Sequence, residues 1–401
     1  METSVQKLLV LFSIIVLMVL VGCVSMPTTQ PVVPNTAQTS VFSAPPIEQT
    51  SSGTDSTNPY LDCLSPALKM NAERAAHSAT LLPDGKVLIA GGFREEGTQE
   101  IAIASAEIFD PTTNTFTPTS DMNEPRNGHT STLLENGQVL IIGGWNQDGR
   151  TSTAELYNPQ KGAFEYVGSL MAPRQGFTAT LLKNGKVLIV GGDSARNTSQ
   201  LTAELYDPAT KSFAPTGMLN HARMAHTATL LRDGKVLLVG GTSGNDEILA
   251  SAEVYDPETG TFTLTSDANI VRYKHTAVLL KDGNVLILGG SNAQDWMGKY
   301  SSAEIYNVKS NTFTKLPDMN RERFKLADAA VLLADGNVLI GGGNRQIEIF
   351  DTQSQEFIPG GTLDDDYYYA VLTPLQHGHV LITGGYNGNI LPSDKAWLYC
   401  G

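Results

Sequence analysis

Hydrophobic and polar positions in this chain follow one phrase that returns along its length. In the first copy, Ser78 to Leu82 predicts a strand, and Val87 to Ala90, which is apolar at every position, predicts a second strand buried on both faces. Between them, Asp84-Gly85 predicts a tight hairpin turn, because this dipeptide accepts a positive φ. Gly91-Gly92 follows the second strand and allows another backbone to approach closely.

Two further strands complete the phrase. Ala106 to Phe109 predicts the third strand, Asp110 to Asn114 a second turn, and Phe116 lies on the fourth strand. The first glycines of successive Gly-Gly pairs are 42 to 53 residues apart. A period of about 50 residues with this mark is typical of a β-propeller. We therefore predict an all-β fold, a seven-bladed propeller of four-stranded antiparallel blades. The copies begin at His77, His129, Phe177, His226, His275, Asp328 and Ala370.

The phrase resembles the Kelch repeat, and the resemblance covers residues 60 to 400 approximately. It implies a Kelch propeller domain, which we place at residues 59–401. Kelch propellers include the central domain of galactose oxidase, a periplasmic sialic-acid epimerase and many binding modules. The fold therefore does not decide the function.

The N-terminal segment predicts export and membrane attachment. Leu8 to Val21 is apolar except for Ser13, and it is too short to span a bilayer, so it suits a signal peptide over residues 1–22. Leu20 to Cys23 resembles the lipobox of bacterial lipoproteins, which implies cleavage before Cys23 and a lipid on its sulfur. An uncleaved signal anchor is the alternative. Residues 23–58 are rich in Pro, Thr and Ser and predict a disordered tether.

The seventh copy of the phrase is incomplete. Ala396 to Cys400 aligns with a third strand, and the fourth strand is missing. Leu64 precedes Arg74 by the same interval as Phe116 precedes Arg126, so Tyr60 to Leu64 predicts an N-terminal strand that closes the last blade. This register places Cys63 opposite Cys400. With Cys23 lipidated, these two cysteines form an even pair in an exported protein, and we predict a disulfide between them.

Several residues recur at one place in each copy and are predicted to be scaffold. Histidines recur at the first position, but Phe177, Asp328 and Ala370 also occupy it, which argues against a metal site. Arginines and glutamates also recur together, and the seventh copy replaces both, with Tyr367 and Trp397. We predict a repeated ion pair between them. The histidines are His77, His129, His226 and His275; the cations are Arg74, Arg126, Arg174, Arg223, Arg272 and Lys325; the acids are Glu107, Glu155, Glu204, Glu253, Glu304 and Glu348.

The candidate site lies where the copies differ. The connections after the second and fourth strands emerge on one rim, where binding residues of a propeller are expected. In the sixth copy the first of these connections is only Asn344 to Gln346, which predicts a low rim beside blade seven. Aromatic rings with carboxylates and cations suit a sugar. The candidate ligand-binding residues are Trp145, Tyr273, Lys274, Trp296, Tyr300, Asp364, Asp365, Asp366, Tyr367, Tyr368, Tyr369 and Tyr386.

The net charge of −14 disfavours a nucleic-acid partner, because binding phosphates needs clustered cations. The first interpretation is a membrane-anchored, monomeric, non-catalytic module that binds a glycan or a protein in the cell envelope. The second is a sugar epimerase or lyase that uses the rim of blades five to seven, and the third is a purely structural assembly module. We assign no catalytic residue, metal or cofactor, and the predicted contact with the lipid bilayer is through acylated Cys23.

Overall fold

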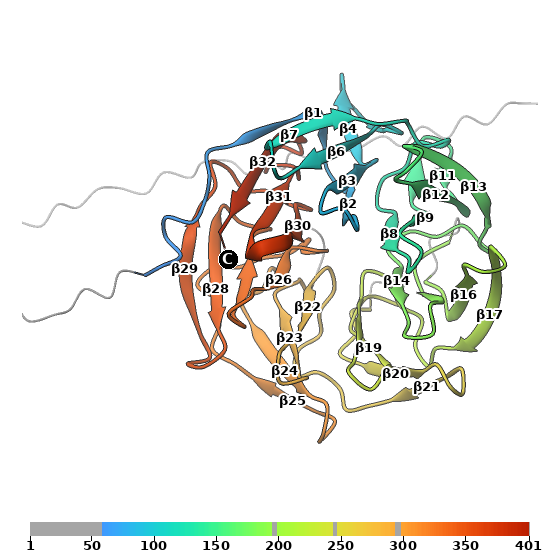
Figure 1. Ribbon diagram of the computed structural model, residues 1–401. Helices are drawn as coiled ribbons and strands as arrows, with labels where there is room; N and C mark the ends of the chain where they lie inside the picture. Colours follow the sequence, from blue (N-terminus) through green and yellow to red (C-terminus); the bar gives the residue numbers. More distant parts are fainter. Residues whose placement is uncertain (1–57, 195–198, 244–246, 293–297, 401) are drawn as a thin grey trace, which may run out of the picture. The chain divides into compact units, whose positions relative to one another are not determined.

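The computed structural model describes residues 58–194, 199–243, 247–292 and 298–400. The predicted signal peptide (1–22) and tether (23–58) lie outside these ranges except for Asn58. Within the described ranges, the predicted all-β fold is confirmed: seven four-stranded antiparallel sheets form the blades of a propeller (Figure 1). No helix in these ranges is long and apolar enough to cross a membrane.

The strands follow the predicted phrase. Blade one contains β2 (Ser78–Leu81), β3 (Val87–Ala90), β6 (Ala106–Asp110) and β7 (Thr115–Pro118), and blade two β8 (Thr130–Leu133), β9 (Val139–Ile142), β12 (Thr153–Asn158) and β13 (Ala163–Ser169). Blade three contains β14 (Thr178–Leu181), β15 (Val187–Val190), β16 (Thr202–Asp207) and β17 (Ser212–Met218), and blade four β18 (Thr227–Leu230), β19 (Val236–Val239), β20 (Ala252–Asp256) and β21 (Thr261–Leu264).

Blades five to seven complete the ring. Blade five contains β22 (Thr276–Leu279), β23 (Val285–Leu288), β24 (Ala303–Asn307) and β25 (Thr312–Lys315), and blade six β26 (Ala330–Leu332), β27 (Val338–Ile340), β28 (Gln346–Asp351) and β29 (Glu356–Thr362). Blade seven contains β30 (Val371–Pro374), β31 (Val380–Thr383), β32 (Ser393–Tyr399) and β1 (Leu68–Arg74), with a short 3-10 turn at η1 (Gln376–Gly378). Two extra hairpins are β4 (Phe93–Glu96) with β5 (Gln99–Ala102), and β10 (Trp145–Asn146) with β11 (Gly149–Arg150).

The first strand of each blade lies innermost, and the first strands contact one another around the ring (Figure 1). β2 lies against both β8 and β30, which closes the circle. Every residue of the second strands, such as Val87 to Ala90, is buried. Apolar side chains on both faces of these strands pack between neighbouring blades, which explains why the strands do not alternate.

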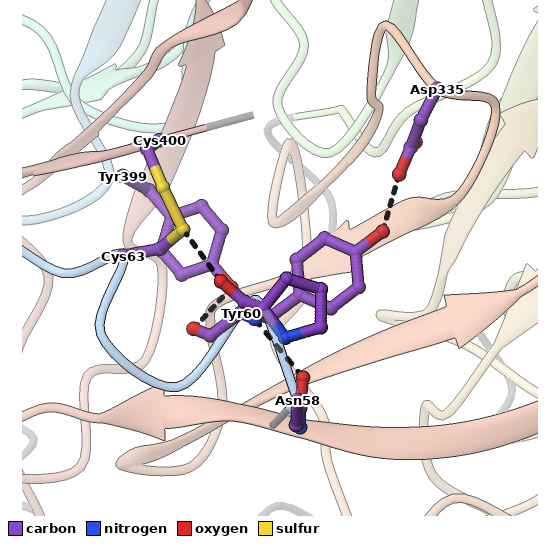
Figure 2. The surroundings of a disulfide bond; sticks show 7 residues. Asn58, Tyr60, Cys63, Asp335, Tyr399 and Cys400 are labelled. Carbon is purple, nitrogen blue, oxygen red and sulfur yellow. Dashed lines mark hydrogen bonds between the residues drawn. A yellow bond between two sulfur atoms is a disulfide. The ribbon is translucent and has the colours of Figure 1, made fainter. Parts of the chain in front are cut away.

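The N-terminal strand closes blade seven, as predicted, but its position differs. β1 spans Leu68–Arg74 and pairs with β32, whereas Tyr60 to Leu64 forms a turn that ends in a single bridge from Leu64 to Tyr399. Pro66 lies between the bridge and the strand and has no N–H to donate, so the ladder is interrupted there. The predicted register holds: Cys63 and Cys400 form a disulfide with their Cα atoms 4.9 Å apart (Figure 2).

The repeated ion pair is present in the first six blades. Each arginine donates to its glutamate at 2.7–2.8 Å, and both side chains are at most 2% exposed. In blade six the cation is Arg323, not the predicted Lys325. The two extra residues of this copy, Ala327 and Asp328, follow the arginine instead of preceding it, so Arg323 keeps its bond to the carbonyl of Gly342. In blade seven, Tyr367 and Trp397 replace the pair and pack with ring centroids 5.1 Å apart.

The recurring histidines are buried between blades. Nε2 of each shares a hydrogen bond of 2.9–3.0 Å with a hydroxyl of the preceding blade. The sixth copy differs from the prediction, because Leu326 occupies the histidine position. The glycine of the preceding blade shows this: Gly289 lies against the side chain of Leu326 in the same way that Gly240 lies against the side chain of His275. Asp328 instead belongs to the two-residue insertion. The bonded pairs are His77 with Thr383, His129 with Ser78, His226 with Thr178, and His275 with Thr227.

Burial of these histidines predicts a loss of stability in acid. Burial, and after it the charge of Arg126, lowers the pKa of His129 to about 3. An unfolded histidine titrates near its ordinary pKa of about 6.5, so the unfolded state alone takes up the proton as the pH falls from there toward 3. His129 should therefore cost about 1.4 kcal/mol of unfolding free energy per pH unit in that window. Denaturant unfolding between pH 7.5 and 5 measures this slope.

The variant His129→Gln isolates this effect, because its amide can still bond Ser78 and does not titrate. We expect its stability to fall less steeply with pH than that of the unchanged protein. Equal slopes would show that His129 is protonated in the folded state.

Candidate functional site

The connections after the second and fourth strands form one rim, called here the upper rim. At one equivalent position, each fourth-to-first-strand connection has a residue with a left-handed φ of 50° to 62°. The backbone N–H groups of several of these residues donate to the carbonyl of the equivalent residue in the preceding connection. Gly128 donates in this way to Ala76 at 2.9 Å, and Lys274 to Ala225 at 2.9 Å. These residues mark the inner edge of the upper rim, and they are Ala76, Gly128, Gly176, Ala225, Lys274, Lys325 and Tyr369.

Large side chains occupy this inner edge only in blades five to seven, where they join an aromatic and lysine cluster. Nζ of Lys325 donates to Oη of Tyr386 at 2.5 Å and lies 5.1 Å from the ring centre of Phe324. Nζ of Lys299 donates to Oη of Tyr368 at 3.0 Å. Tyr368 and Tyr386 are 4% and 5% exposed, so the cluster is a packed wall with polar tips.

A polar pocket of about 310 Å³ opens beside this wall. It lies at the short connection of blade six, where the sequence predicts a low rim. Its walls come from three blades: Lys299 from blade five, Arg321 and Glu322 from the connection into blade six, and Asp366 and Tyr368 from the connection into blade seven. The remaining lining residues are Asn320, Gly343 and Asn344.

Charged groups of both signs face this pocket. Nε of Arg321 donates to Oε1 of Gln346, which orients the guanidinium. Oδ1 of Asp366 accepts the backbone N–H of Arg345 at 2.8 Å. Among the described residues, no protein group bonds the terminal nitrogens of Arg321, the Glu322 carboxylate or Oδ2 of Asp366. These groups can therefore bond a ligand without losing a protein partner.

The predicted site residues divide between the pocket and its surroundings. Asp366 and Tyr368 line the pocket. Tyr369 and Tyr386 belong to the wall beside it, with ring centroids 6.0 Å apart. Tyr273 and Lys274 lie at the inner edge in blade five, where Nζ of Lys274 is 5.2 Å from the ring centre of Tyr273. Tyr300 does not line the pocket, and Cζ of Arg272 lies 5.7 Å from its ring centre. Trp296 lies outside the described residues.

Three predicted residues support the connection into blade seven. Burial, and after it the charge of Asp364, raises the pKa of Tyr367 to about 12, and its hydroxyl donates to Asp364 at 3.0 Å. Asp364 is also paired with Lys395. Asp365 is exposed and accepts the amide of Asn387 at 3.1 Å. Trp145 lies far along the ring, in the hairpin of blade two.

Sequence reasoning did not select Lys299, Arg321, Glu322 or Asn344 as site residues. The available signal was the short connection that contains Asn344.

Comparison with known families agrees with this architecture. The Kelch motif matches residues 74–123 and 125–171, and the β-propeller of tRNA wybutosine-synthesizing protein 4 matches residues 220–395. The chain is a Kelch-repeat β-propeller protein. Its fold supports a binding or structural module.

Two individual proteins are similar to this Kelch propeller. A solved structure of a fungal alcohol oxidase of the AA5 family, in complex with copper, superposes with a TM-score of 0.69 at 15% identity, over 84% of this chain and 76% of that one. This likeness shows the fold alone. The spermatocyte protein spe-26 of Caenorhabditis elegans is 32% identical over 73 residues, which are 18% of this chain and 13% of that protein.

The residues of this Kelch propeller do not fit a copper centre such as the one that the oxidase holds. In the described part of the chain, no three His, Cys, Asp or Glu side chains are grouped to hold a metal ion. The buried histidines bond hydroxyls between blades, and the disulfide lies on the lower rim, at the turns opposite the pocket. We therefore derive no copper chemistry for this chain.

Proposed function

We propose that this protein is a non-catalytic binding module whose rim pocket takes a glycan, and that Cys23 anchors it to a membrane of the cell envelope. The observation that carries the proposal is the polar pocket formed by three blades beside the low connection of blade six. The predicted Asp366 and Tyr368 both line it.

The chemistry of the pocket suits sugar hydroxyls, which both donate and accept hydrogen bonds. Arg321 and Asn344 supply donors, and Glu322 and Asp366 supply acceptors. Tyr368 presents its hydroxyl end on a ring held edge-on against Phe324, with centroids 5.2 Å apart. Because the walls are already packed, binding requires little additional ordering of side chains.

The position of the N-terminal segment supports the proposed anchoring. Asn58, the first described residue, donates to the carbonyl of Pro359. The hydroxyl of Tyr60 donates to Asp335 (Figure 2). Asp335 belongs to a first-to-second-strand turn, so this segment lies at the lower rim. The described chain therefore enters the propeller at the rim opposite the pocket.

Glycan-array screening of the full-length protein tests the proposal. We expect bound glycans, and we expect Asp366→Asn to weaken binding about tenfold, because the amide keeps the bond from Arg345 but loses the charge that accepts a hydroxyl. Asp365→Asn, which removes the adjacent exposed charge outside the pocket, is the matched control. An array without any bound glycan would reject the proposal. Equal losses in the two variants would place binding elsewhere.

A further inference from the structure

We infer that the pocket recognises a sugar that carries one carboxylate, such as a hexuronate unit of a polysaccharide. This inference rests on the proposed glycan-binding function and specifies its ligand class. It depends on the arrangement of the charged groups, which distinguishes an acidic sugar from a neutral sugar and from a phosphate.

The guanidinium of Arg321 is arranged to bind a carboxylate. Gln346 accepts its Nε–H, so the side chain is oriented while its two terminal nitrogens remain available at the pocket. Two parallel N–H donors match the two oxygens of a carboxylate, and such charge-assisted pairs are stronger than neutral hydrogen bonds. A neutral sugar offers this fork no anionic partner.

Lys299, on the connection between the second and third strands of blade five, adds a second cation. Its ammonium bonds the hydroxyl of Tyr368 at 3.0 Å and lies 5.0 Å from the ring centre of Phe324. These contacts fix the charge at the wall of the pocket. A ligand placed between Lys299 and Arg321 therefore meets positive charge from blade five and from the connection into blade six.

Two carboxylates of the same pocket limit the ligand's negative charge. Glu322 and Asp366 line the pocket together with the two cations, so the four charges balance. A phosphate, which carries more than one negative charge near pH 7, would be repelled by these acids. The acids instead accept hydroxyl protons. A polyol with a single carboxylate satisfies the cations and the acids together.

The size of the pocket fits this ligand. Its volume of about 310 Å³ is at the lower end of the range of small-molecule sites, about 300–1,000 Å³. One or two sugar units fill such a space.

Matched sugars test the inference. We would measure binding of D-galacturonate against D-galactose and of D-glucuronate against D-glucose, on the full-length protein by calorimetry and with the corresponding oligosaccharides on the array. Each pair differs only in one carboxylate. We expect the acidic member to bind about 10- to 100-fold more tightly, the range for a charge-assisted hydrogen bond. Inorganic phosphate should not compete.

Arg321→Gln should abolish this preference, and Arg321→Lys should keep only part of it, because lysine retains the charge without the fork. Arg345→Gln is the control: it removes the same charge from an exposed side chain outside the pocket lining. Unfolding midpoints verify that each variant is folded. Equal binding of acidic and neutral sugars, competition by phosphate, or a preference unchanged in Arg321→Gln would overturn the inference while the glycan-binding function stands. Binding of no glycan of either kind would reject both.

Discussion

Replacing both Cys63 and Cys400 by serine should lower the free energy of unfolding by up to about 6 kcal/mol. The disulfide joins residues 337 positions apart, and the chain-entropy model assigns this value to so long a loop as an upper figure. Without the bond, the ring is held closed by the ladder between β1 and β32, by the contacts of residues 58–65 and by the packing of blade seven against blade one. Denaturant unfolding of the double variant measures the loss, and hydrogen exchange should show β1 opening first.

The intact protein provides the controls for this experiment. Reduction should raise its mass by about 2 Da, the two hydrogens of the thiols, and Cys63→Ser alone should be as unstable as the double variant. An unchanged mass on reduction would show that the thiols are not joined. Unchanged stability of the double variant would show that the blade is closed by its non-covalent contacts alone.

Breaking one buried ion pair should cost about 3–5 kcal/mol, because it leaves an uncompensated charge in the interior. Arg174 and Glu204 are 2.7 Å apart and each is 1% exposed. We expect Arg174→Ala to lose somewhat more than Glu204→Ala, since Arg174 also donates to the carbonyl of Gly191 at 2.8 Å. The double variant should lose little more than the larger single variant. A double-mutant cycle by denaturant unfolding measures the coupling.

Lys186→Ala is the matched control in the same blade, because the Lys186–Asp207 pair is solvent-exposed and should contribute little. Additive losses of Arg174→Ala and Glu204→Ala would reject their coupling. A large loss for Lys186→Ala would show that surface charge, not burial, dominates the result.

The blade count and the disulfide could be predicted from sequence because both depend on register within a repeated unit. Counting from Phe116 to Arg126 and from Leu64 to Arg74 placed Cys63 opposite Cys400 without any knowledge of packing. The predicted ion pairs depended on the same counting. In blade six the interval from Phe313 to Arg323 is the same and points to the correct cation. The prediction of Lys325 failed because it depended on the interval to Asp328, which contains the insertion.

The pocket was only partly predictable because its walls come from separate connections. Asp366 and Tyr368 belong to a conspicuous acidic and aromatic run, but Tyr367 of the same run packs against Trp397 instead. Lys299, Arg321 and Glu322 do not form a local motif. Arg321 and Glu322 are consecutive, but Lys299 comes from another connection, and the three meet beside the short connection of blade six only in the folded ring.

The cross-link between the ends of the ring also determines how the propeller bears mechanical load. Cys63 precedes β1 in the chain, and its disulfide partner Cys400 directly follows β32. A pull applied at Asn58 therefore passes through the sulfur atoms into β32 before it reaches the hydrogen bonds of β1. Tension along a tether would strain a covalent bond first, and the wheel would keep its shape instead of unzipping from its N-terminal strand.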